Sequence, residues 1–118
     1  MTTIKTTIYH NPRCSKSRET LALLQAHGVD ITVVEYLKTP PTAAEIHTIL
    51  QQLGLTARQL MRSKEDEYKA QNLANTSLSE QQLIAAMVAT PKLIERPIVL
   101  ANNKAVIGRP PENVLSIL

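Results

Sequence analysis

The chain has 118 residues, which is enough for one domain with a hydrophobic core and too few for two. Its content of 43% apolar and 19% charged residues is typical of a globular protein, while a formal net charge of only +3 and the absence of Trp and Phe argue against nucleic acid as a partner. One cysteine, Cys14, excludes an internal disulfide, and three scattered histidines (His10, His27 and His47) lack the spacing of a zinc site.

The first third of the chain predicts a strand, a helix and a second strand. Residues 4–9 (IKTTIY) alternate and end in β-formers, and the following NPRC is a turn because Asn-Pro initiates turns. A helix is predicted from residue 15 to about residue 27, with Gly28 as a left-handed cap. Residues 30–37 (DITVVEYL) predict the second strand, which completes a right-handed βαβ unit with parallel strands.

The middle third is predicted to be helical. Thr42 and Glu45 form a capping box, and Gly54 ends a helix whose apolar face comprises Ala43, Ile46, Leu50 and Leu53. Thr56 and Gln59 repeat the capping device, and the polar SKEDEYKAQNLA predicts a short helix with loops. A further helix begins at Ser79, with a buried stripe of Leu83, Ile84, Met87 and Val88.

The last third predicts a hairpin and a closing helix. Residues 96–110 (RPIVLANNKAVIGRP) hold two short apolar runs around paired asparagines, which tolerate the positive φ angles of a tight turn. Pro111 stands near the first turn of the closing helix, PENVLSIL. The element order predicts a single α/β domain over residues 1–118, with a four-stranded mixed sheet and a helical subdomain inserted at about residues 42–90.

Cys14 is predicted to be a reactive thiol because it stands at the start of the first helix. Free N–H groups and the positive end of the helix dipole favour a thiolate there, and such thiols have pKa values of roughly 3.5–7.5 instead of ~8.5. Ser17 is on the same helix face and is placed to donate its hydroxyl to the sulfur, and three nearby cations add positive charge (Arg13, Lys16 and Arg18). The alternative is an inert buried cysteine. A phosphatase-type loop is disfavoured because Thr20 stands where its arginine is required.

Four separated motifs, IYHNPRCSKSRETL, LMRSKEDEY, ERPIV and GRPPENVL, resemble those of the glutaredoxin-linked arsenate reductases and their short relatives. The resemblance runs from Ile4 to Leu118 in the family's order and spacing, and it implies a thioredoxin-like fold with a helical insertion. It matches Cys14 to the nucleophile that attacks arsenic. It also matches Arg62, Arg96 and Arg109 to the three arginines of the oxyanion site. Their guanidinium groups bind a tetrahedral anion and stabilise the thiolate.

The same resemblance assigns supporting positions. His10 matches a residue near the nucleophile, Ser17 the serine that follows it, and Pro97 a cis-proline that faces the active site. Taken singly, each residue has an ordinary structural explanation; Arg62, for example, would suit the end of a helix. The three arginines taken together with Cys14 have a shared purpose that these explanations do not supply.

The resemblance implies that arsenate, or a similar oxyanion, is reduced with glutathione as the electron donor and glutaredoxin as the protein partner. No bound cofactor and no metal are implied, and we expect a monomer that binds neither nucleic acid nor membrane. The N-terminal MTTIKTTIYH lacks the apolar stretch of a signal peptide, so we expect the protein in the cytoplasm, where its thiol stays reduced.

Two other classes remain open from the sequence. Spx-type regulators share this fold and bind RNA polymerase, but many carry Cys-x-x-Cys where this chain has Cys14 and Ser17. A glutathione-dependent thiol oxidoreductase resembling the monothiol glutaredoxins would share the Cys-x-x-Ser pattern. Neither class explains why the three arginines occur together.

Overall fold

The computed structural model describes residues 4–118 and divides them into two compact units. The first unit comprises the described residues up to Thr39 together with Arg96–Leu118, and the second comprises Pro40–Glu95. The segment predicted as a helical insertion, at about residues 42–90, lies within the second unit. No helix within residues 4–118 combines the length and the apolar content needed to cross a membrane. Each unit is described separately below.

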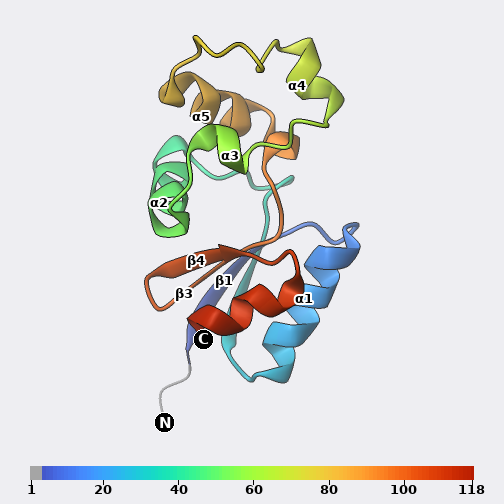
Figure 1. The fold of residues 1–118 in the computed structure, drawn as a ribbon. Coiled ribbons are helices and arrows are strands. Elements are labelled where there is room, and N and C mark those ends of the chain that lie inside the picture. Colours follow the sequence, from blue (N-terminus) through green and yellow to red (C-terminus); the bar gives the residue numbers. More distant parts are fainter. Residues whose placement is uncertain (1–3) are drawn as a thin grey trace. The chain divides into compact units, whose positions relative to one another are not determined.

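The first unit is built on a four-stranded mixed sheet, as predicted (Figure 1). Its strands are β1 (Lys5–His10), β2 (Asp30–Glu35), β3 (Ile98–Ala101) and β4 (Lys104–Ile107), in the order β2-β1-β3-β4. β1 is parallel to β2 and antiparallel to β3, and β3 is antiparallel to β4. The hairpin between β3 and β4 turns at Asn102 and Asn103, which have φ angles of 54° and 61°, so the predicted role of the paired asparagines is confirmed.

One face of this sheet is covered by α1 (Ser15–Ala26) and by the C-terminal helix η2 (Pro111–Ile117). Gly28 follows α1 with φ +66°, as the capping pattern predicts. The hydrophobic core between the sheet and the two helices consists of Ile8, Leu24, Val99, Ala101, Val114 and Ile117. The closing helix is a 3-10 helix, whose buried side chains (Pro111, Val114 and Ile117) recur every third residue and so fit three residues per turn.

The second unit contains α2 (Ala43–Leu53), α3 (Ala57–Leu60), α4 (Asp66–Ala70), α5 (Glu80–Ala89) and the short 3-10 helix η1 (Pro91–Leu93). The capping boxes predicted for α2 and α3 are both present, and Ser79 begins α5 with a third one. The predicted apolar face of α2 is partly wrong: Ala43 is exposed and Ile49 is buried instead. In α5, Val88 is only half-buried.

Candidate active site

Cys14 occupies the N-cap position of α1, at the end of the turn that follows β1. Its backbone N–H donates to the carbonyl oxygen of Asn11 at 3.0 Å, and its own carbonyl accepts from the N–H of Arg18 at 3.0 Å. The side-chain oxygen of Asn11 accepts from the N–H of Arg13 at 3.0 Å and tightens the turn. Local hydrogen bonding thus places the half-buried thiol at the positive end of the helix.

The pKa of Cys14 lies below the usual value of a thiol. Burial acts in the opposite direction and raises the pKa, but the backbone N–H of Ser17, the guanidinium of Arg96 and the backbone N–H of Lys16 together lower it further than burial raises it. Arg96 acts both through a hydrogen bond and through its charge. The surroundings of Cys14 therefore favour the thiolate, which is the nucleophilic form.

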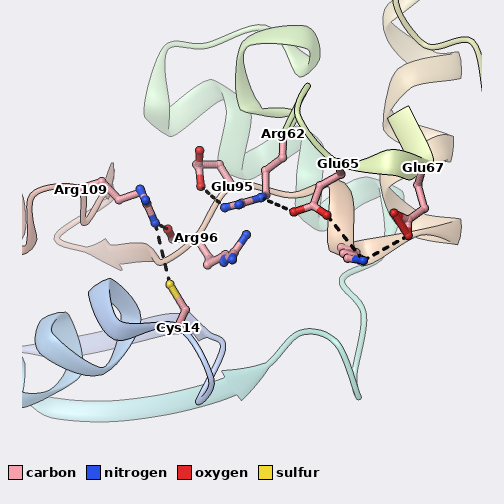
Figure 2. Close-up of polar contacts among 8 residues, drawn as sticks. Cys14, Arg62, Glu65, Glu67, Glu95, Arg96 and Arg109 are labelled. Carbon is pink, nitrogen blue, oxygen red and sulfur yellow. Dashed lines mark hydrogen bonds and ion pairs between the residues drawn. The ribbon is translucent and has the colours of Figure 1, made fainter. Parts of the chain in front are cut away.

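Arg109 is the second cation at the sulfur. Its Nη1 lies 3.9 Å from Sγ of Cys14 and donates to the carbonyl oxygen of Arg96 at 3.4 Å (Figure 2). Two cis peptide bonds flank this region: Arg96–Pro97, which the resemblance predicts, and Arg109–Pro110, which it did not predict. The first unit thus brings Cys14, Arg96 and Arg109 together.

Gly108 sets the backbone just before Arg109. Its N–H donates to the carbonyl of Pro97 at 2.9 Å, and its carbonyl accepts from the hydroxyl of Thr20 at 3.3 Å. A Cβ at this position would lie 2.6 Å from Oγ1 of Thr20 and 2.9 Å from Cγ of Pro97. Only glycine lets the loop that carries Arg109 approach α1 and the cis-proline this closely.

His10 and Ser17 form a buried polar pair beneath the turn. Nδ1 of His10 lies 2.6 Å from Oγ of Ser17, and the same oxygen accepts from the N–H of Asn11 at 3.0 Å. The Ser17 hydroxyl, which the sequence predicts as a donor to the sulfur, is paired with His10 in the structure, and Ser17 acts on Cys14 through its backbone N–H. Burial lowers the pKa of His10; the charge of Glu35 raises it and that of Arg18 lowers it.

Arg62 belongs to the second unit and has carboxylate partners. Its Nε lies 3.0 Å from Oε1 of Glu65, its Nη1 lies 2.9 Å from Oε1 of Glu95, and its N–H donates to the carbonyl of Leu93 at 2.7 Å (Figure 2). The helix α3 ends at Leu60 with Met61 as its C-cap, so Arg62 is the first residue after the helix. The guanidinium is held by ion pairs whose side chains are 18–29% exposed.

A lysine extends this network of charges. Nζ of Lys92 lies 3.6 Å from Oε2 of Glu65 and 3.4 Å from Oε2 of Glu67. The charge of Glu67, followed by that of Glu65, raises the pKa of Lys92. Sequence reasoning missed the carboxylate partners of Arg62, although the spacing from Arg62 to Glu65 is a signal for an ion pair within one turn. Glu95 had no such signal, since it is distant in the sequence.

No group of three or more His, Cys, Asp or Glu side chains among residues 4–118 is arranged to hold a metal ion. The chemistry available in the first unit is that of one activated thiol with two guanidinium groups beside it. Such donors bind a negatively charged oxygen or stabilise a thiolate.

Comparison with known proteins gives a consistent result. The ArsC family matches residues 9–117 of the chain. The protein YfgD of Escherichia coli (strain K12) is 64% identical over 112 residues, covering 94% of this chain and 94% of YfgD. An arsenate reductase of Neisseria meningitidis (strain MC58) is 51% identical over 112 residues, covering 94% of this chain and 96% of that protein. The structure of an arsenate reductase from Vibrio cholerae superposes with a TM-score of 0.96 at 53% identity, covering 99% of this chain and all of that one.

Proposed function

The chain belongs to the ArsC family, and on this basis we propose that it reduces arsenate to arsenite with electrons from glutathione, using Cys14 as the nucleophile. The observation that carries the proposal is the thiol at the start of α1 with its pKa lowered, in part by Arg96, and with Arg109 at 3.9 Å. A thiolate with two guanidinium groups suits attack on an oxyanion, because the same groups neutralise the charge of both reactants.

The proposed reaction begins when the Cys14 thiolate attacks arsenic. An oxygen of arsenate leaves as water, and a covalent thiol–arsenate adduct forms. Glutathione then bonds to the arsenic through its own sulfur as a second water leaves. The two sulfurs join, each giving up one electron, and arsenic goes from As(V) to As(III). Arsenite is released, and Cys14 remains in a mixed disulfide with glutathione.

Glutaredoxin is the proposed partner that resolves this mixed disulfide. The single cysteine of the chain supports an external partner, because an internal relay needs a second thiol. In this scheme Arg62, Arg96 and Arg109 bind the arsenate oxygens, and His10, Ser17 and Pro97 support the site around the nucleophile.

The proposal is tested by measuring arsenate-dependent NADPH consumption in the presence of glutathione, glutaredoxin and glutathione reductase. We expect turnover with the wild type and none with Cys14→Ser, since a serine hydroxyl is not ionised at neutral pH and forms no disulfide. Turnover that survives in Cys14→Ser would overturn the mechanism. No turnover by the wild type, with mixed-disulfide reduction intact, would instead identify a thiol oxidoreductase that acts on another substrate.

A further inference from the structure

A pocket of about 250 Å³ lies beside the turn that carries Cys14, and the reaction described above assigns it no role. One wall is formed by residues 10–13 of the β1 end and turn, and the other by Glu35, Leu37 and Lys38 at the end of β2. Pro12 and Leu37 give the pocket an apolar part, and the other lining residues are polar or charged. The side chain of Leu37 is 45% exposed, which is high for a large hydrophobic residue. The pocket lies wholly within the first unit.

The sheet order places this pocket and the arginines on different sides of the nucleophile. Cys14 follows β1, which lies between β2 and β3. Arg96 precedes β3 and Arg109 follows β4, so both approach the sulfur from the β3–β4 side. The pocket is formed between the ends of β1 and β2, on the other side. A second reactant can therefore approach the Cys14 turn without displacing the guanidinium groups.

The charges around the pocket define the chemistry of its ligand. Arg13 and Lys38 supply two cations and Glu35 supplies one anion. Nζ of Lys38 lies 3.7 Å from Oε1 of Glu35, and the two side chains are 79% and 42% exposed. Such an exposed ion pair is weak, so both side chains can turn toward a bound molecule. A compact ligand with two carboxylates, one ammonium group and an apolar stem complements this set.

We propose that the pocket between the β1 turn and the end of β2 binds glutathione, with Arg13 and Lys38 facing its carboxylates and Glu35 its ammonium group. Glutathione has the required charges and carries the thiol that a chain with one cysteine has to obtain from outside. The role of the bound thiol in arsenate reduction rests on the proposed function. The binding of glutathione to the pocket does not depend on that function.

The test uses glutathione disulfide and needs no arsenate. The Cys14 thiolate attacks one sulfur of this disulfide, the S–S bond breaks, a Cys14–glutathione disulfide forms, and the second glutathione leaves as a thiolate. The rate is followed by mass spectrometry and compared with the rate for hydroxyethyl disulfide, which is uncharged. The ratio of the two rates cancels any change in the reactivity of Cys14 itself.

We expect the wild type to prefer glutathione disulfide, and the double variant Arg13→Glu with Lys38→Glu to reduce that preference by about tenfold. The double variant Arg13→Ala with Lys38→Ala should reduce the preference for glutathione disulfide in the same direction but by less. It serves as the test if the variant with both charges reversed does not fold. The matched control is Lys5→Glu with Lys104→Glu, which reverses two charges at the opposite end of the sheet, and it should leave the ratio unchanged.

A wild type that reacts with both disulfides alike would overturn the proposal. A double variant that slows both reactions equally, or a control that changes the ratio as much, would also overturn it. If the preference holds while arsenate-dependent turnover is absent, the pocket is retained and the proposed function falls. If turnover is present without the preference, the proposed function is retained and the glutathione pocket falls.

Discussion

The two units of the molecule use arginine in different ways. In the first unit, Arg96 and Arg109 act on a sulfur: one lowers the pKa of Cys14, and the other lies 3.9 Å from it. In the second unit, Arg62 donates to two carboxylates, of Glu65 and Glu95, at 3.0 and 2.9 Å. The same kind of side chain thus favours a thiolate in one unit and is itself oriented by anions in the other.

This difference indicates what each setting supplies. A guanidinium beside a thiol contributes positive charge, which stabilises the thiolate and any anion that approaches it. A guanidinium between two carboxylates contributes little net charge, but its remaining N–H donors are held in a fixed direction. We therefore expect substitutions at the first kind of arginine to change the reactivity of Cys14, and substitutions around the second kind to change stability and orientation.

Arg96→Ala is expected to give the largest effect among the substitutions that test this comparison. Loss of a charged hydrogen bond costs ~1.5–3 kcal/mol, so the KM for arsenate should rise roughly 10- to 150-fold. The pKa of Cys14 should also rise, which slows alkylation by iodoacetamide at pH 7 several-fold. Arg62→Ala is the matched control: we expect the alkylation rate to stay unchanged, because Arg62 is paired with the carboxylates of Glu65 and Glu95. Equal slowing of alkylation in both variants would contradict the division of roles.

Gly108→Ala should cost about 1–3 kcal/mol of unfolding free energy and also reduce turnover. The added Cβ would meet Thr20 at 2.6 Å and Pro97 at 2.9 Å, and relief of these contacts shifts the loop that carries Arg109. Gly54→Ala in the second unit is the control, because Gly54 has φ +69° and open space around it. It should lower stability, by about 1–2 kcal/mol, without changing kcat/KM of the folded enzyme. Unchanged kcat/KM in Gly108→Ala would show that Arg109 needs no such placement.

Much of the fold could be predicted from the sequence, because its signals are local. Alternation, capping residues and turn asparagines indicated all four strands and the major helices, and each of these signals acts over a few neighbouring residues. The errors occur where tertiary packing decides. Ile49 is buried and Ala43 is exposed because the contacts of α2 select the face. The closing helix is present as predicted, and the structure adds that it is a 3-10 helix.

The candidate site was predictable to a smaller extent. The position of Cys14 at the start of a helix follows from the turn before it, and the arginines follow from the resemblance of the motifs. Contacts between distant segments were not accessible: the pairing of Arg62 with Glu95 and the close approach of Gly108 to Thr20. The pairing of the Ser17 hydroxyl with His10 spans only seven residues, but it depends on how the turn between them folds. Each depends on how the chain folds back, and no local pattern encodes it.

Glu95→Gln should lower the free energy of unfolding by about 1 kcal/mol, since it weakens a charged hydrogen bond between side chains that are 21% and 29% exposed. Glu19→Gln, in the first unit, is the matched control: its ion pair with Lys16 is 3.5 Å long and about half exposed, so the loss should be below ~0.5 kcal/mol. Both values come from urea denaturation. Equal losses in the two variants would mean that the carboxylates do not hold Arg62.

The smallest expected effect is the pH dependence that His10 gives to the first unit. Burial lowers its pKa in the folded protein below the ~6.5 of an exposed histidine. As the pH falls through this range, the unfolded chain therefore binds more protons than the folded protein does. The resulting stability is fully present above ~6.5 and is lost as the pH falls toward the lower, folded-state pKa, with a slope below ~1.4 kcal/mol per pH unit. In urea denaturation between pH 7.5 and 5, His10→Gln should therefore have a shallower profile than the wild type.

Glu35→Gln sharpens this test because the charge of Glu35 raises the pKa of His10. Without that charge the folded-state pKa falls further, and the loss of stability should continue to lower pH than in the wild type. The two variants thus move the profile in opposite directions, one flattening it and the other extending it. Parallel profiles in all three proteins would mean that the buried pair of His10 and Ser17 contributes no pH dependence, and that the pH sensitivity of the first unit arises from other groups.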